Sequence, residues 1–232
     1  MNPRYSLVVP LHNEAGNILP LMEQAVAVLA ARDAPCEIIL VDDGSTDGTA
    51  GEIEQAAARW PVCRKISLLH RAGQAAALFA GLQTAQGEFI LTMDGDGQND
   101  PRDFPALLEP VEADRVDVMC GWRVDRHDRG WRRLASRLAN GVRRRLLDDG
   151  VHDAGCQLRV LRSSVRTAVR PVEFMQSFLP ALAVAAGFRV GEQPVRHHAR
   201  TRGRSKYGVT QLWWRPAVAM LRLRSELRRS RP

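Results

Sequence analysis

Two carboxylates and an amide alternate with glycines in the segment Asp94-Gly95-Asp96-Gly97-Gln98, which directly follows an apolar run. Hard oxygen ligands at this spacing suit Mg²⁺ or Mn²⁺, which keep some of their waters and also bind substrate phosphates. The same composition is common in plain turns whose carboxylates are solvated. Taken alone, the segment therefore leaves a metal site and a turn as alternatives.

Other polar clusters follow apolar runs in the first half of the chain. Asp42 and Asp43 come directly after CEIILV, and the segment PLHNE at 10–14 ends the first run. One or two residues of 42–49 could cap a helix, but capping does not explain adjacent carboxylates at a buried strand end. Because such carboxylates repel each other, a ligand that hydrogen-bonds to them, such as a ribose or a base, would offset their cost.

The elements that must position these clusters follow from the periodicity of the first 120 residues. Strands are expected at 5–10, 36–41, 65–69, 88–93 and 116–120, and helices at 15–31, 49–60 and 74–84. Strands that alternate with helices pair in parallel, and strands that are apolar along their length are typical of a sheet covered on both faces. We therefore predict an α/β fold with a mostly parallel central sheet.

Ligands of such a sheet lie beyond the carboxyl ends of its strands. We expect the polar clusters to converge on that edge: Asn13-Glu14, Asp42-Asp43, Arg71 and Asp94-Gly95-Asp96.

After residue 121 the pattern changes. Helices are expected at 129–147, 173–186 and 211–228, a loop followed by a strand at 151–161, and a strand at 188–199. No repeat or low-complexity linker divides the chain. We therefore expect one domain over 1–208, with halves at 1–121 and 122–208, followed by a basic amphipathic helix in 209–232.

The formal net charge of +7 is unevenly distributed. Residues 1–121 hold 8 basic and 18 acidic side chains, whereas residues 196–232 hold 11 basic and 1 acidic. A basic chain favours anionic partners, but the acidic half and the lack of a recognised binding module argue against a nucleic-acid-binding protein. Hydrophobic residues at 45% and charged residues at 25% exclude disorder, collagen and coiled coil as overall descriptions.

Cysteine spacing and apolar run lengths bear on the compartment. The four cysteines form no CxxC motif, so buried free thiols and a reducing, cytoplasmic compartment are expected. The sequence contains no run of 18 apolar residues, so no transmembrane helix is predicted. No signal peptide is visible at the N-terminus.

Together, PLHNE, VDDGSTDGT and GEFILTMDGDGQNDP resemble the inverting, nucleotide-sugar-dependent glycosyltransferases of family 2, which have the GT-A fold. The match in order and spacing covers about the first 120 residues. The resemblance implies a DxD motif at Asp94 and Asp96 that binds Mg²⁺ or Mn²⁺. It also implies contacts to a GDP- or UDP-linked sugar at Pro10, Asn13, Glu14, Asp43, Arg71 and Asp94.

The later half is similar to the polyprenol-phosphate glycosyltransferases, the dolichol-phosphate mannosyltransferase-like group. The similarity rests on DxDxQ at 94–98, GWR at 121–123, the basic helix and RxxGxSK at 200–206. It implies that Gln98 joins the metal site. It also implies that the acceptor lipid phosphate is held by Arg123, Arg132, Ser136, Arg200, Ser205 and Lys206. The sequence departs from this group in two places: it has DGDGQ where DADxQ is usual, and Trp122 where a small residue is common. Because of these differences, the resemblance does not identify the sugar that is transferred.

A phosphate acceptor is already anionic at pH 7 and needs no strong general base, which agrees with the lack of an obvious catalytic histidine. The expected reaction is an inverting attack at the anomeric carbon. The alternative keeps the donor half but uses a hydroxyl of a glycan or small molecule as acceptor. It would need a carboxylate base, for which Asp153 is the best candidate.

Two basic segments, 129–147 and 211–228, carry apolar stripes flanked by arginines. Such helices lie in membrane interfaces, although an ordinary amphipathic helix packed on the domain has the same pattern. We therefore expect peripheral attachment to the cytoplasmic face of a membrane. A membrane-protein partner or a homo-oligomer is the alternative means of attachment.

Overall fold

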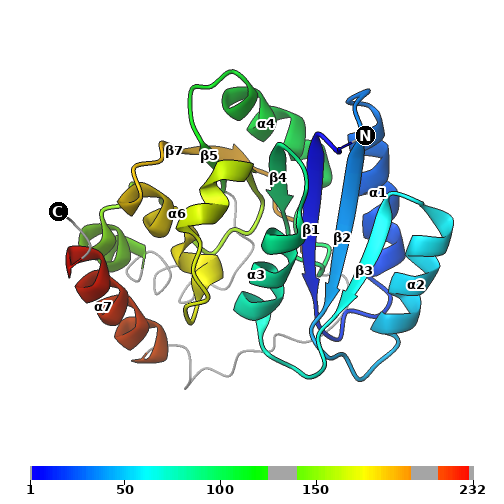
Figure 1. Ribbon diagram of the computed structural model, residues 1–232, viewed down its shortest axis with the longest axis horizontal. Coiled ribbons are helices and arrows are strands. Elements are labelled where there is room, and N and C mark those ends of the chain that lie inside the picture. The colour runs from blue at the N-terminus through cyan, green and yellow to red at the C-terminus, as the bar shows by residue number, and fades with distance from the viewer. Residues whose placement is uncertain (1, 125–139, 200–213, 230–232) are drawn as a thin grey trace.

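A computed structural model describes residues 2–124, 140–199 and 214–229. One seven-stranded sheet runs through it in the order β3-β2-β1-β4-β6-β5-β7 (Figure 1). The strands are β1 (Tyr5–Leu11), β2 (Cys36–Asp42), β3 (Cys63–Ser67), β4 (Phe89–Thr92), β5 (Val118–Arg123), β6 (Arg159–Arg162) and β7 (Val190–Val195).

Strand directions confirm the prediction of a mostly parallel sheet. Four neighbouring pairs are parallel, and β6 alone among these strands runs antiparallel to both of its neighbours, β4 and β5. In the register of the parallel part, Leu11 lies beside Asp42, and Asp42 beside Ser67. The loops that follow β1, β2 and β3 therefore leave the sheet at one edge.

Helices cover both faces of the sheet. They are α1 (Ile18–Ala30), α2 (Thr49–Arg59), α3 (Gln74–Thr84), α4 (Phe104–Glu112), α6 (Met175–Ala185) and α7 (Trp214–Arg229), with 3₁₀ turns at Pro101–Asp103 and Ser163–Ala168. Residues 140–147 are also helical; the rest of the helix expected at 129–147 lies outside the described residues. Figure 1 shows α3 and α6 on the side of the sheet that faces the viewer.

Alternation along the strands explains why they are apolar throughout. In β1, Leu7 and Val9 face the core formed with α1, α2 and α4, whereas Val8 faces the core formed with α3, α6 and α7. Successive side chains of a strand point to opposite faces, so a sheet buried on both sides needs apolar residues at every position. The same two cores enclose three of the four free cysteines, and burial raises the pKa of the Cys63 thiol to about 12.

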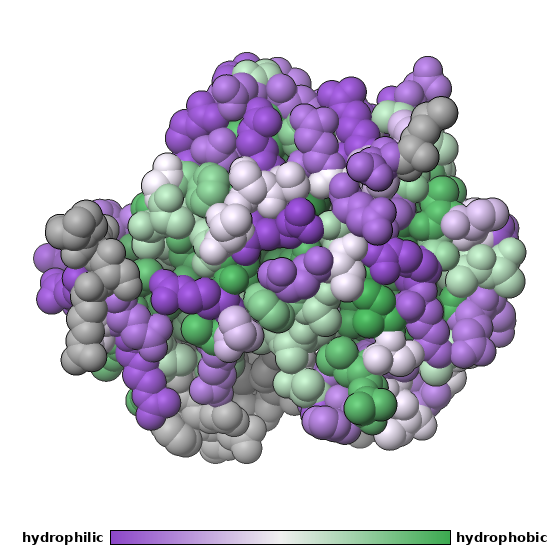
Figure 2. Space-filling model, viewed as in Figure 1, coloured by the Kyte–Doolittle hydropathy of each residue, from purple (hydrophilic) through white to green (hydrophobic). Residues whose placement is uncertain are grey.

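Helix α7 packs one face onto the domain. Met220 and Leu223 are buried in the core that α7 shares with α3 and α6, whereas Val218 and Leu221 are exposed. Hydrophilic and hydrophobic residues are interspersed on the molecular face shown in Figure 2. None of the helices in the described ranges combines the length and apolar character needed to cross a membrane.

Glu37 ties β2 to its neighbours at the amino edge of the sheet. Its carboxylate accepts hydrogen bonds from the Ser6 hydroxyl at 2.6 Å, the Gln86 N–H at 2.7 Å and Arg64 Nε at 2.7 Å. Burial alone would raise the pKa of Glu37, but these donors outweigh it and hold the pKa below its usual value.

We expect Glu37→Gln to lower the free energy of unfolding at pH 7 by about 1.5–3 kcal/mol, because hydrogen bonds to a charged group are lost. A depressed carboxyl pKa stabilises the fold above the unfolded value of about 4.3 and loses that effect as the pH falls through the folded value. The difference from wild type should therefore shrink below about pH 4. Urea unfolding at several pH values measures it, with the exposed Glu54→Gln as control. An equal difference at pH 7 and pH 3 would contradict the assignment.

Candidate active site

The polar clusters that follow β1, β2, β3 and β4 meet at the carboxyl edge of the sheet, as predicted. The Asp43 N–H donates to the Leu11 carbonyl at 2.8 Å, and His12 Nδ1 lies 2.8 Å from the Asp43 carbonyl. Pro10 is half-buried and lies beside Val41 in the register. The first two clusters thus form one connected structure.

Asn13 and Glu14 are held by the loop that follows β2. The Asn13 N–H donates to the Ser45 hydroxyl at 3.0 Å, and the Asn13 side-chain oxygen accepts from the Thr46 N–H at 2.8 Å. The Glu14 N–H donates to Thr49 Oγ1 at 2.8 Å. Asn13 adopts a left-handed backbone conformation with φ of 52°, which short polar side chains tolerate. The VDDGSTDGT segment therefore shapes the turn that presents Asn13 and Glu14.

Asp43 fixes the loop between β3 and α3. Its buried carboxylate accepts hydrogen bonds from the Ala72 N–H at 2.6 Å and the Gly73 N–H at 2.9 Å. Arg71 belongs to the same loop and is exposed. Asp43 therefore sets the position of Arg71, in addition to any contact of its own with a ligand.

Gly44 allows these two loops to approach. Its φ is +61°, and a Cβ added there would lie 2.6 Å from the Arg71 backbone nitrogen. We expect Gly44→Ala to displace the loop at 70–73 and to weaken binding of a nucleoside diphosphate about tenfold or more, because a left-handed alanine and a backbone clash together cost more than 1.4 kcal/mol. Calorimetric titration measures the affinity. The control is Gly51→Ala, where an added Cβ meets nothing within 4 Å; equal affinities in the two variants would contradict the expectation.

The DxD segment follows β4 and is tightly folded. Asp94 is half-buried, and Asp96 is buried with 8% of its surface exposed. Asp96 accepts a hydrogen bond from the Gln98 N–H at 3.1 Å, and the Asp94 N–H donates to Asn99 Oδ1 at 3.2 Å. Gln74, from the start of α3, donates through Nε2 to Asp94 Oδ1 at 2.7 Å.

Negative charge accumulates at this segment. Burial raises the pKa of Asp94 to about 7, and the neighbouring charges of Asp96 and Glu14 act in the same direction, while Arg123 and Arg159 act against them. A bound divalent cation would remove this repulsion. Within the described ranges, no three His, Cys, Asp or Glu side chains gather into a metal site. The predicted set of Asp94, Asp96 and Gln98 supplies two carboxylates and an amide, and this all-oxygen donor set fits Mg²⁺ or Mn²⁺.

Gln98 connects the DxD segment to the end of the segment that follows β7. Its carbonyl accepts from the His198 N–H at 2.9 Å, its side-chain Nε2 donates to the His198 carbonyl at 3.3 Å, and Asn99 bridges to His197. Asp100 reinforces the contact, because its carboxylate lies 3.0 Å from His198 Nε2 and 3.4 Å from Arg196. Residue 199, where the described part of this segment ends, therefore lies close to the predicted metal ligands.

Arg123 and Asp153 form a buried ion pair. Arg123 Nε lies 2.7 Å from Asp153 Oδ2, a second guanidinium nitrogen lies 2.9 Å from Oδ1, and the side chains are 13% and 5% exposed. Glu192 fixes the loop of Asp153 by accepting from the N–H groups of His152 and Asp153 at 2.9 Å. Trp122 stacks on His152 with ring centroids 4.9 Å apart. The remaining predicted acceptor residues, Arg132, Ser136, Arg200, Ser205 and Lys206, lie outside the described residues.

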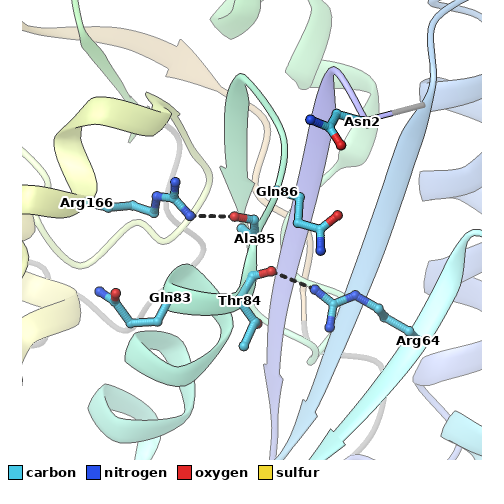
Figure 3. A pocket seen from close by; sticks show the side chains of 7 residues that line it. All are labelled: Asn2, Arg64, Gln83, Thr84, Ala85, Gln86 and Arg166. Atoms are coloured by element: carbon cyan, nitrogen blue, oxygen red, sulfur yellow. Dashed lines mark hydrogen bonds between the residues drawn. The ribbon is translucent and has the colours of Figure 1, made fainter.

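A polar cavity lies at the opposite edge of the sheet. Arg64 and Arg166 border it and donate to the carbonyls of Thr84 and Ala85 at 2.8 Å and 2.5 Å, as Figure 3 shows. Because this cavity adjoins the end of α3 and the amino ends of the strands, it is separate from the DxD segment.

Solved structures with a similar fold are glycosyltransferases. A mannosyltransferase from Pyrobaculum calidifontis in complex with GDP-Man and Mn²⁺ has a TM-score of 0.61 and 22% identity, over 88% of this chain and 59% of that chain. Glucosyl-3-phosphoglycerate synthase from Mycobacterium tuberculosis with Mg²⁺ and UDP has a TM-score of 0.70 and 18% identity, over 96% and 79%. At these identities the likeness defines the fold, which is the predicted GT-A glycosyltransferase fold.

The chain belongs to glycosyl transferase family 2, whose model matches residues 6–168. Dodecaprenyl-phosphate galacturonate synthase from Rhizobium johnstonii is 40% identical over 210 residues, which cover 89% of this chain and 62% of the relative. Undecaprenyl-phosphate 4-deoxy-4-formamido-L-arabinose transferase from Edwardsiella ictaluri is 38% identical over 209 residues, which cover 89% and 64%. The chain thus spans less than two thirds of the length of these relatives. The family model and the names of these two relatives confirm the predicted resemblance to polyprenol-phosphate glycosyltransferases.

Proposed function

We propose that the protein transfers a sugar from a nucleoside diphosphate sugar to a polyprenyl phosphate, with inversion at the anomeric carbon and with the help of Mg²⁺ or Mn²⁺. The names of the two relatives, both acting on a polyprenyl phosphate, support the acceptor class. The observation that carries the proposal is that hydrogen bonds bring the loops of Asn13, Asp43 and Asp94 together at the carboxyl edge of the sheet.

The donor half, residues 1–121, would hold the nucleotide sugar. Asp94, Asp96 and Gln98 would hold the cation, which when bound neutralises charge on the departing diphosphate. The nucleotide would contact the loops that present Pro10, Asn13, Glu14, Asp43 and Arg71. These loops are already fixed by mutual hydrogen bonds, so the site is organised before the donor arrives.

The acceptor half, residues 122–208, would bring a second anion to the same place. Arg123 would contact the lipid phosphate, together with Arg132, Ser136, Arg200, Ser205 and Lys206. The phosphate oxygen carries its own negative charge and attacks the anomeric carbon as the bond to the diphosphate breaks. Since no proton has to be removed, the side chains contribute by proximity and by screening the repulsion between the two anions.

A hydroxyl acceptor is less well supported, because it would need a base. In the structure Asp153, the best candidate, has both carboxylate oxygens engaged by Arg123. An aspartate held in this way serves to orient the arginine and to balance its charge. The ion pair therefore favours the phosphate acceptor.

Residues 209–232 would hold the protein at the cytoplasmic face of a membrane, alone, as a homo-oligomer or with a membrane-protein partner. Helix α7 buries Met220 and Leu223 and leaves Leu221, Val218 and Arg222 outward, so an apolar and basic face stays available beside the packed one. Such a face suits anionic headgroups. Co-sedimentation with anionic vesicles but not with zwitterionic ones is the expected result, and no binding to either would contradict it.

Incubation with labelled UDP- and GDP-sugars, undecaprenyl phosphate and Mn²⁺, followed by extraction with organic solvent, tests the function. We expect label in the lipid phase and its loss when a chelator is added. Label confined to a water-soluble glycan would favour the hydroxyl acceptor. Absence of transfer together with tight, salt-sensitive DNA binding would reject both.

A further inference from the structure

Gln74 makes a short contact with the first aspartate of the DxD segment. It is the first residue of α3, and its Nε2 donates to Asp94 Oδ1 at 2.7 Å. The backbone just before it is held by the Asp43 carboxylate, which accepts from the N–H groups of Ala72 and Gly73. Gln74 therefore extends from a fixed position and restricts the rotation of the Asp94 carboxylate.

A buried amide lies beside the oxygen end of the half-buried Gln74 side chain. Gln176 Nε2, from α6, lies 3.5 Å from Gln74 Oε1, and Gln176 is 6% exposed. An amide whose oxygen receives a donor must present its nitrogen elsewhere, so this contact directs Gln74 Nε2 toward Asp94. The orientation of Gln74 thus depends on a residue from the other half of the domain.

Gln176 is in turn held by a fully buried arginine. Arg159 in β6 donates to the backbone carbonyl of Gln176 at 2.5 Å and to the backbone carbonyl of Ala154 at 2.8 Å. Arg159 thus fixes the start of α6, where Gln176 lies, relative to β6.

An amide suits the position beside Asp94. A lysine or arginine would form an ion pair with Asp94 and compete with a cation for it, and a carboxylate would add repulsion. A neutral donor orients one oxygen of Asp94 and leaves its charge available. Residues that support metal ligands in this way typically contribute 10–100-fold to metal affinity.

We propose that Gln74, oriented by Gln176, is a positioning residue for Asp94, and that the relay Arg159–Gln176–Gln74 couples the acceptor half of the domain to the metal site. The proposal rests on the proposed function, since it assigns the relay to the cation that Asp94 would hold. It adds three side chains from β6, α6 and α3 that do not themselves touch the cation.

Mn²⁺ binding tests the relay independently of activity. The free-ion electron paramagnetic resonance signal is followed during titration of Mn²⁺ into the full chain with saturating UDP or GDP. Gln74→Met keeps the length of the side chain and removes the donor, and we expect the Mn²⁺ dissociation constant to rise about 10–100-fold. Gln176→Met should give a smaller rise. The double variant should bind no more weakly than Gln74→Met alone, because Gln176 acts through Gln74.

Gln83→Met is the matched control, since Gln83 is exposed on the same helix. It should leave both Mn²⁺ affinity and melting temperature unchanged. Wild-type Mn²⁺ affinity in a folded Gln74→Met chain would overturn the proposal. So would a double variant whose Mn²⁺ dissociation constant rises by the product of the two single effects. If Gln74→Met does not fold, Gln176→Met still decides: a smaller rise in the Mn²⁺ dissociation constant supports the proposal, and wild-type affinity overturns it. Failure of the wild-type chain to bind Mn²⁺ would instead reject the metal assignment itself, and with it the purpose of the relay.

Discussion

Asp96→Asn is expected to lower the rate of sugar transfer about a thousandfold while leaving the fold as stable as wild type or more so. A metal that stabilises charge on the leaving group contributes several kcal/mol, and about 4 kcal/mol corresponds to three orders of magnitude. Stability should not suffer, because Asp96 adds to the charge repulsion that raises the pKa of Asp94. Asparagine also keeps an oxygen that can accept from the Gln98 N–H.

Initial rates of transfer at saturating Mn²⁺, together with thermal melts, measure both effects. Asp33→Asn is a suitable control, because Asp33 is exposed and its left-handed conformation, with φ of 47°, suits asparagine equally well. A folded Asp96→Asn chain with more than a tenth of the wild-type rate would falsify the role of Asp96 in the metal site. A large drop in melting temperature would instead indicate a structural role.

The second large effect concerns the Arg123–Asp153 pair. Asp153→Leu should destabilise the fold by about 3–5 kcal/mol, because it leaves a buried guanidinium without its partner. For a domain of this size the melting temperature should fall by about 6–20 °C. Arg123→Met should destabilise to a similar extent, since it leaves the Asp153 carboxylate unpaired.

Combining Arg123→Met with Asp153→Leu separates stability from function. Replacing both charges of a buried pair by apolar side chains is often neutral, so the double variant should melt close to wild type. It should nevertheless transfer no sugar to polyprenyl phosphate, because the acceptor-side guanidinium is gone. The exposed pair Arg59–Glu23, treated in the same way, should change stability by less than about 1 kcal/mol. Full activity in the stable double variant would show that Arg123 does not serve the acceptor.

The first half of the fold could be predicted because its signals are local. Each of β1, β2 and β4 is a short apolar run that ends at a polar cluster, and the parallel arrangement brings those clusters to one edge. Helix α4 was not predicted, because Pro105 and Pro110 interrupt its helical pattern. Strand β3 begins at Cys63, two residues earlier than predicted, and ends at Ser67, so that Leu69 is fully exposed instead of continuing the strand.

The supporting contacts of the site could not be predicted, because they join residues far apart in the sequence. Arg123 and Asp153 are 30 residues apart, and Gln74 and Gln176 are 102 apart. The one available signal was the glutamine that opens an otherwise alanine-rich helix at 74–84. Arg159 interrupts an apolar strand and would be expected at a surface, yet two backbone carbonyls and nearby carboxylate charge allow it to be fully buried. Tertiary contacts of this kind leave no periodic pattern.

The nucleotide released during transfer tests the central claim most directly. If the acceptor phosphate attacks the anomeric carbon, the bond between that carbon and the diphosphate breaks and nucleoside diphosphate leaves intact. With undecaprenyl phosphate as acceptor, we predict one nucleoside diphosphate for each sugar found in the lipid extract, and neither product when the chelator is present. Release of nucleoside monophosphate in proportion to the lipid product, or nucleoside diphosphate matched only by a water-soluble glycoside, would contradict the account.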